Sequence, residues 1–242
     1  MGLTAMGQPL HTVRLWLRLG RVSNLPTVWT NTLTGMVLAG GSLQSIQLPM
    51  LLIAFTLFYT GGMFLNDAYD REHDRRSRPD RPIPAGLISA HTVFAMGYGM
   101  LTIASLIVIG VGRDKGWASA ASASVLAGAI VAYDIHHKSN PCGPWIMALC
   151  RAFIYIAAAA AISGRVNGAV IVGAAVLFAY VAGFTYAAKQ SRTPANTVGK
   201  LIAGISLVDA GLMAAHGALG AGAVAALGCV LTRRWQRSIE GT

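Results

Sequence analysis

Charged residues are scarce in this chain: Asp, Glu, Lys and Arg together make up 12% of its 242 residues. A soluble domain carries about twice that charged fraction. Acidic residues are the rarer kind, with nine Asp and Glu against 19 Lys and Arg, which gives a formal net charge of +10. This scarcity excludes an ordinary soluble domain. Apolar runs of about 20 residues recur along most of the chain and indicate an all-α, polytopic membrane protein.

Cysteine is also scarce, with three in the chain. The three cysteines, Cys142, Cys150 and Cys229, lie in or beside apolar segments. Their odd number and their spacing exclude a disulfide framework and a zinc site.

The apolar runs predict eight transmembrane helices in one integral-membrane domain over residues 1–242. The predicted spans are 22–41, 48–67, 91–111, 117–134, 143–162, 167–187, 201–216 and 218–232. The last two are short and rich in Gly and Ala, which leaves open a tilted helix, a broken helix or one misassigned segment.

The basic residues are distributed unevenly between the two sides of this layout. With the N-terminus inside, fifteen of the 19 Lys and Arg fall in inner loops and three in outer loops, while Arg151 falls within a helix. This bias predicts a multi-pass protein of the cell membrane with both termini in the cytoplasm. It also explains the net charge by contact with anionic membrane lipid, so we expect no nucleic-acid partner.

A cluster of acidic residues ends the second predicted span, in the segment 61–86, GGMFLNDAYDREHDRRSRPDRPIPAG. If the helix continues past residue 67, each residue advances about 100°, so Asn66, Asp67, Asp70 and Asp74 share one face. Clustered carboxylates repel one another unless a cation is bound, and Mg²⁺ accepts oxygen ligands together with a phosphate. The segment therefore predicts a Mg²⁺–diphosphate site at the membrane surface, with a solvated charged helix end as the alternative.

The spacing N-D-x-x-D-x-x-x-D, followed by a basic loop and R-P-I-P-A-G, resembles the first motif of the UbiA superfamily of intramembrane prenyltransferases. Segments 21–27 (RVSNLPT), 133–138 (YDIHHK) and 147–155 (MALCRAFIY) extend the resemblance over most of the chain. Within the superfamily the chain looks most like the EboC-like branch. The resemblance implies a bundle of usually nine helices around a lateral cavity, capped by two Asp-rich loops that bind a prenyl diphosphate through Mg²⁺.

The resemblance also implies a reaction. The prenyl diphosphate loses pyrophosphate, and an aromatic or other electron-rich lipophilic acceptor attacks the allylic carbocation within the membrane, with no protein partner required. By position, the implied catalytic residues are Asn66, Asp67, Asp70, Asp74 and Lys138, of which the first four hold Mg²⁺. The candidate substrate-binding residues are Asn24, Arg78, Arg81, Tyr133, Lys138, Arg151, Tyr155, Tyr186, Lys189, Arg192 and Asp209.

Several of these substrate contacts have an equally simple alternative. Arg78 and Arg81 belong to a basic loop that the charged inner surface alone would explain, but they are the better candidates for the diphosphate because adjacent prolines stiffen their loop. Asn24 and Tyr155 are polar groups suited either to a cavity or to helix packing. Asp209, in the middle of a predicted span, is either a hydrogen-bonded neutral carboxyl or a contact to the acceptor.

The second acidic motif of the family is missing. The corresponding segment 186–200, YAAKQSRTPANTVGK, contains no acidic residue. Lys189 and Arg192 are able to carry the pyrophosphate charge instead, or they only reflect the topology of the chain. The departure leaves two functions open: a Mg²⁺-dependent prenyltransferase, or a prenyl-lipid-binding or transport component that retains the first motif alone.

Overall fold

The computed structural model describes residues 8–136, 140–191 and 193–239. This part of the chain is helical, without strands, and holds nine α-helices and two short 3₁₀ turns, at Val22–Asn24 and Arg113–Lys115. The α-helices are α1 (Gln8–Leu19), α2 (Leu25–Leu38), α3 (Gln47–Ser77), α4 (Ala90–Val111), α5 (Ala118–His136), α6 (Gly143–Ser163), α7 (Gly168–Ser191), α8 (Ala195–Ala215) and α9 (Leu219–Gln236).

Six helices, α3 to α8, are long and apolar enough to cross a membrane. The predicted spans 22–41 and 218–232 are also helical, as α2 and α9, but neither is among these six helices. Helix α2 has 14 residues, about 21 Å of helix against a hydrocarbon core of about 30 Å, and α9 carries Arg233 and Arg234 in its last turn. Helices α8 and α9 are separate, which resolves the ambiguity at the end of the chain.

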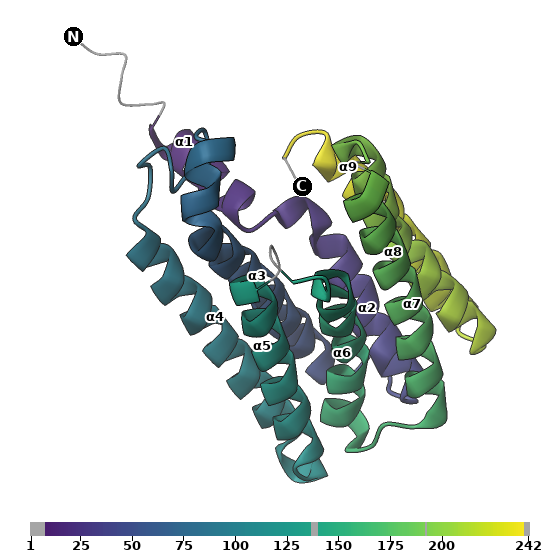
Figure 1. Ribbon diagram of the computed structural model, residues 1–242. Coiled ribbons are helices and arrows are strands. Elements are labelled where there is room, and N and C mark those ends of the chain that lie inside the picture. Colours follow the sequence, from purple (N-terminus) through teal and green to yellow (C-terminus); the bar gives the residue numbers. More distant parts are fainter. Residues whose placement is uncertain (1–7, 137–139, 192, 240–242) are drawn as a thin grey trace.

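The helix that the apolar runs did not predict is α1. Its sequence, QPLHTVRLWLRL, mixes apolar and basic residues and contains no long apolar run. Trp16 of α1 stacks on Phe64 of α3, so α1 lies against the bundle at the end where α3 finishes (Figure 1).

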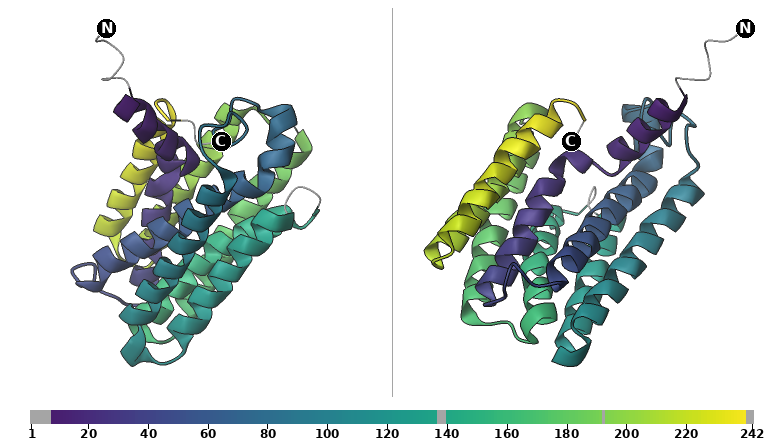
Figure 2. Two further views of the ribbon diagram at one scale, coloured as in Figure 1. Left: turned by 90° about the vertical axis from the view of Figure 1, so that its left-hand side faces the viewer. Right: turned by 180° about the vertical axis from the view of Figure 1, so that it is seen from behind.

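Helix α2 occupies the centre of the bundle. It contacts α3, α6, α8 and α9, and twelve of its 14 residues are buried. A Cβ added at Gly35 would lie 2.8 Å from the Cα of Tyr155, so α2 and α6 approach closely because this position has no side chain. Figure 2 (right) shows α2 lying between α3 on one side and α9 on the other.

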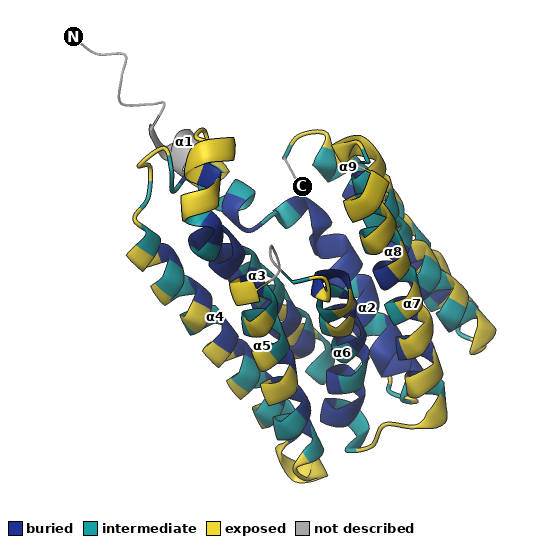
Figure 3. Cartoon of the chain, viewed as in Figure 1, coloured by how far each residue is buried: buried dark blue, intermediate teal, exposed yellow. Residues whose placement is uncertain are grey.

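The outer faces of the bundle are apolar and exposed, as expected where lipid replaces water. Ile103 and Leu106 on α4, Ile171 on α7, and Leu227 and Val230 on α9 are each more than half exposed. Figure 3 shows this exposure following the outward faces of the helices.

Helix α3 is the element that carries the acidic motif. It runs ten residues past the predicted end of its span, to Ser77, and its 31 residues extend about 46 Å. The continuation confirms the helical geometry expected for Asn66–Asp74. The last turns of α3 therefore project beyond the apolar part of the bundle, at the same end as α1 and the C-terminal end of α9 (Figure 1).

Candidate functional site

A cavity of about 450 Å³ lies between α3, α5, α6, α7 and α8. One part of its wall is apolar and includes Phe58, Leu126, Ile154, Phe184 and Ile205. The other part is polar and charged. Its residues are Arg21, Asn24, Asn66, Asp70, His73, Asp74, Arg78, Arg81, Tyr133, Asp134 and Arg151. A single chamber thus joins a charged end to an apolar one.

The acidic face of α3 is buried rather than solvated. Asn66, Asp67, Asp70 and Asp74 are each at most 8% exposed. Asn66, Asp70 and Asp74 line the cavity, whereas Asp67 borders a smaller neighbouring pocket. The alternative interpretation, a solvated charged helix end, therefore does not describe these four residues.

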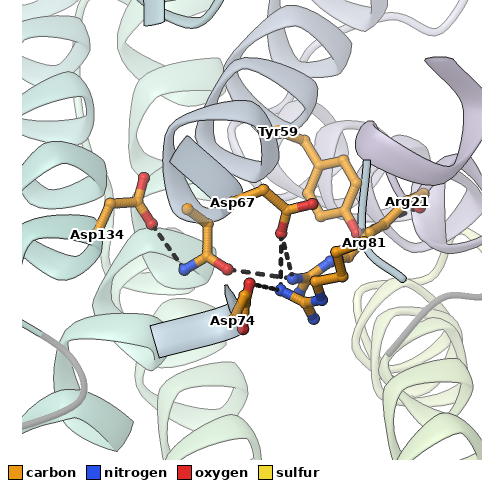
Figure 4. Close-up of polar contacts among 7 residues, drawn as sticks. Arg21, Tyr59, Asp67, Asp74, Arg81 and Asp134 are labelled. Atoms are coloured by element: carbon orange, nitrogen blue, oxygen red, sulfur yellow. Dashed lines mark hydrogen bonds and ion pairs between the residues drawn. The ribbon is translucent and has the colours of Figure 1, made fainter. Parts of the chain in front are cut away.

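Two arginines from other segments neutralise this face. Nη1 of Arg81 lies 3.1 Å from Oδ1 of Asp67 and 2.7 Å from Oδ2 of Asp74. Nη2 of Arg21 lies 3.1 Å from both Oδ1 of Asn66 and Oδ1 of Asp67. Figure 4 shows both guanidinium groups meeting at the Asp67 carboxylate. Charge pairing of this kind lets Asp67 and Asp74 share one helix face.

Arg21 has an unusual backbone conformation. It has φ 42°, in the left-handed region, at the turn between α1 and the 3₁₀ turn that precedes α2. A non-glycine residue there costs roughly 1–3 kcal/mol and persists where its surroundings fix it. Burial acts to lower the pKa of Arg21, but the charge of Asp67 and its hydrogen bond more than offset this, so the pKa is raised. Arg21 is therefore a fixed positive charge beside the acidic motif.

A second polar group lies deeper, where α2, α6 and α8 meet. Nη1 of Arg151 donates to Oγ1 of Thr27 at 3.1 Å and to Oδ1 of Asn31 at 3.3 Å. Nδ2 of Asn31 donates to both carboxylate oxygens of Asp209 at 3.0 and 2.9 Å, and the hydroxyl of Tyr155 donates to the same carboxylate. Arg151 lines the cavity, whereas Asp209 and Tyr155 are fully buried and lie behind it.

The remaining candidates divide by location. Asn24, Arg78 and Tyr133 line the cavity. Tyr186 and Lys189 are not among the residues that line the cavity. Tyr186 is 49% exposed, and Nζ of Lys189 donates to the backbone carbonyl of Asn140. The predicted roles of Lys138 and Arg192 fall outside the described residues.

Arg21 and Asp134 are site residues that the sequence interpretation did not select. Arg21 stands 45 residues before Asn66 and Asp134 68 residues after it, so their pairing appears only in three dimensions. One signal was available: acidic residues are rare in this chain, and Asp134 is an acid at the end of an apolar run.

The residues of the polar end fit Mg²⁺ by the chemistry of their donors. Asp70, Asp74, Asn66 and Asp134 offer hard oxygen ligands to the cavity, and Oδ2 of Asp134 has no hydrogen-bond partner in the described chain. Among the described residues, no three carboxylates, imidazoles or thiols converge as a complete metal cage. Such a cage is not required, because Mg²⁺ is commonly bound by one or two carboxylates together with substrate phosphates.

Comparison with known proteins agrees with this architecture. A digeranylgeranylglyceryl phosphate synthase from Methanothrix thermoacetophila is 38% identical over 92 residues, 38% of this chain and 34% of the relative. One from Natronomonas pharaonis is 29% identical over 180 residues, 74% of this chain and 61% of the relative. The first of these matches thus spans about a third of the relative's length.

Solved structures share the fold. A structure described as a digeranylgeranylglyceryl phosphate synthase in membranes superposes with a TM-score of 0.63 at 15% identity, over 93% of this chain and 86% of the other. A UbiA homologue from Archaeoglobus fulgidus bound to GPP and Mg²⁺ gives a TM-score of 0.55 at 17% identity, over 93% and 87%. The EboC-like assignment stays a prediction. The model of the UbiA prenyltransferase family matches residues 28–237, and the chain belongs to this family.

Proposed function

We propose that this protein transfers a prenyl group from a prenyl diphosphate to a lipophilic, electron-rich acceptor within the membrane, in a Mg²⁺-dependent reaction. One observation carries the proposal. The cavity of about 450 Å³ joins carboxylates and guanidinium groups at one end to an apolar wall at the other. A prenyl diphosphate has the same two parts, a highly charged head and an apolar tail.

The polar end has residues for both the cation and the leaving group. Asn66, Asp70 and Asp74 would hold Mg²⁺, which supplies charge neutralisation to the departing pyrophosphate when bound. Arg78 and Arg151 line the same cavity, and guanidinium groups donate strong charge-assisted hydrogen bonds to phosphate oxygens. Preorganised donors of this kind stabilise negative charge as it develops on the leaving group.

The apolar end suits an allylic carbocation. Its wall contains Phe58 and Phe184 beside aliphatic side chains. Such a wall excludes water, which would otherwise capture the carbocation, and aromatic faces attract a cation.

The acceptor is the less defined substrate. The curated relatives are named for the synthesis of digeranylgeranylglyceryl phosphate, so geranylgeranyl diphosphate with a geranylgeranyl-substituted glyceryl phosphate is the first pair to assay. Aromatic acceptors form the second group.

The alternative is a prenyl-lipid-binding or transport component without turnover. The acid-free segment 186–200 favours it, because the family usually has a second acidic pair there. This function retains binding of the prenyl diphosphate and loses release of pyrophosphate.

Two measurements on the purified full chain in detergent test these proposals. Calorimetric titration with a nonhydrolysable prenyl diphosphate analogue, with and without Mg²⁺, tests the shared binding step. Pyrophosphate release with native donor and acceptor then separates transferase from binder. Absence of Mg²⁺-dependent binding would contradict both functions.

Asp70→Asn gives the residue-level test. Loss of a cavity-facing carboxylate lowers the rate of pyrophosphate release by roughly 10²-fold or more, since it removes charge stabilisation from the cation site. Glu72→Gln is the matched control: it removes one negative charge from the same turn of α3, where the side chain is 65% exposed and pairs with Arg75. Equal rates for Asp70→Asn and Glu72→Gln would remove Asp70 from the site.

A further inference from the structure

Asp134 is the one acidic residue of the described cavity wall that does not come from α3. It lies near the end of α5 and is 2% exposed. Nδ2 of Asn66 donates to its Oδ1 at 3.2 Å. Its Oδ2 is buried and has no hydrogen-bond partner within residues 8–136, 140–191 and 193–239. A buried carboxylate oxygen without a donor is costly, so its presence in a cavity wall points to a ligand.

The far wall of the cavity has no carboxylate of its own. Helices α7 and α8 contribute Val181, Phe184, Ile202 and Ile205 there, and the segment 186–200 that joins these helices is free of acids. Asp70 and Asp74 both lie on α3, so a cation that is held by a second helix as well as by the substrate phosphates takes its carboxylate from elsewhere in the wall. Helix α5 packs on α3 and supplies Asp134.

The Asn66 amide fixes the orientation of this carboxylate. It donates to Asp134 through Nδ2 and accepts from Arg21 through Oδ1. Arg21 also contacts Asp67, so one chain of hydrogen bonds connects the acidic motif of α3 to Asp134 (Figure 4). Oδ1 is engaged in this chain, and Oδ2 is left for a cation.

We propose that Asp134 is a cation ligand that supplies, from α5, the carboxylate missing from the second acidic segment, and that it binds the divalent cation of the diphosphate together with Asp70. This inference rests on the proposed function, since the cation arrives with a prenyl diphosphate. Two structural roles compete with it. In the first, Asp134 only holds Asn66 in place. In the second, its Oδ2 accepts a hydrogen bond from a basic side chain of the protein itself. Neither role involves the cation.

The Mg²⁺ requirement for binding of the nonhydrolysable prenyl diphosphate analogue distinguishes these roles without any turnover. Asp134→Asn keeps an Oδ1 acceptor for Asn66 and removes the charge. We expect it to raise the Mg²⁺ concentration for half-maximal analogue binding by about tenfold or more, while Glu72→Gln stays within about twofold of the unsubstituted protein. An unchanged Mg²⁺ requirement in Asp134→Asn overturns the inference.

A change of metal preference provides a second test, which can be used even if Asp134→Asn fails to fold. A thiolate ligand favours soft metals over hard ones. In Asp134→Cys, we expect the preference for Cd²⁺ over Mg²⁺ in analogue binding to rise about tenfold. The references are the unsubstituted protein and Glu72→Cys, because both also contain the three native cysteines. An unchanged preference overturns the inference. If the unsubstituted protein shows no Mg²⁺-dependent binding, the proposed function fails and this inference fails with it.

Discussion

At the scale of single residues, the site depends on compensation between charges that the chain brings from separate segments. Arg81 lies between Asp67 and Asp74, and all three side chains are largely buried. An acidic pair at this depth is stable because Nη1 of the Arg81 guanidinium donates to both carboxylates. Arg81 also lines the cavity. Its contacts with Asp67 and Asp74 therefore hold a positive charge where an anionic ligand would bind.

Removing Arg81 takes a shared ion-pair donor from two buried carboxylates, of which Asp67 keeps its contact with Arg21. Arg81→Gln should destabilise the protein by roughly 3 kcal/mol, the cost typical of breaking a buried ion pair from one side. Added Mg²⁺ should restore part of the loss, because it brings positive charge to Asp74 in place of Arg81. Thermal unfolding in detergent, with and without Mg²⁺, measures both effects. Arg75→Gln is the control: its ion pair with Glu72 is mostly exposed and contributes about 0–1 kcal/mol, and an equal loss there would contradict this account.

At the scale of elements, the central position of α2 sets the spacing of the bundle. Its neighbours α6 and α8 carry Arg151 and Asp209, and both reach hydrogen-bond partners on α2. The approach of α2 to α6 therefore determines where the Arg151 guanidinium meets the cavity.

Gly35 offers a direct test of that approach. Gly35→Ala places a Cβ 2.8 Å from the Cα and 2.9 Å from the backbone oxygen of Tyr155, and backbone atoms have no rotamer with which to yield. We expect a loss of about 1–3 kcal/mol, typical of overpacking, seen as a lower unfolding temperature in detergent. Gly99→Ala on α4 is the matched control, because nothing lies within 4 Å of its added Cβ. Its helix should be unchanged or slightly more stable.

At the scale of the whole molecule, hydrophobic length predicted the bundle, and charge spacing predicted the acidic face of Asn66–Asp74. Both are local properties of the chain. Helix α1 escaped prediction because its apolar residues are interspersed with arginines, and α3 was cut short because its last turns are polar. The contacts of Arg21 and Asp134 with Asn66 join residues 45 and 68 positions apart. Single-sequence periodicity carries no information about such pairs.

The distribution of charge also predicts which end of the bundle meets the cytoplasm. The last turns of α3 and the C-terminal end of α9 lie at one end, and the 3₁₀ turn Arg113–Lys115 lies at the other (Figure 1). The positive-inside rule assigns the first end, which holds most of the arginines, to the cytoplasm. In a cysteine-free background, Lys115→Cys should react with a membrane-impermeant maleimide in intact cells, and Arg76→Cys should react only after permeabilisation. Both side chains belong to exposed residues, so access to the reagent reports sidedness rather than burial. Labelling of Arg76→Cys in intact cells would reverse the orientation and move the diphosphate site to the outer surface.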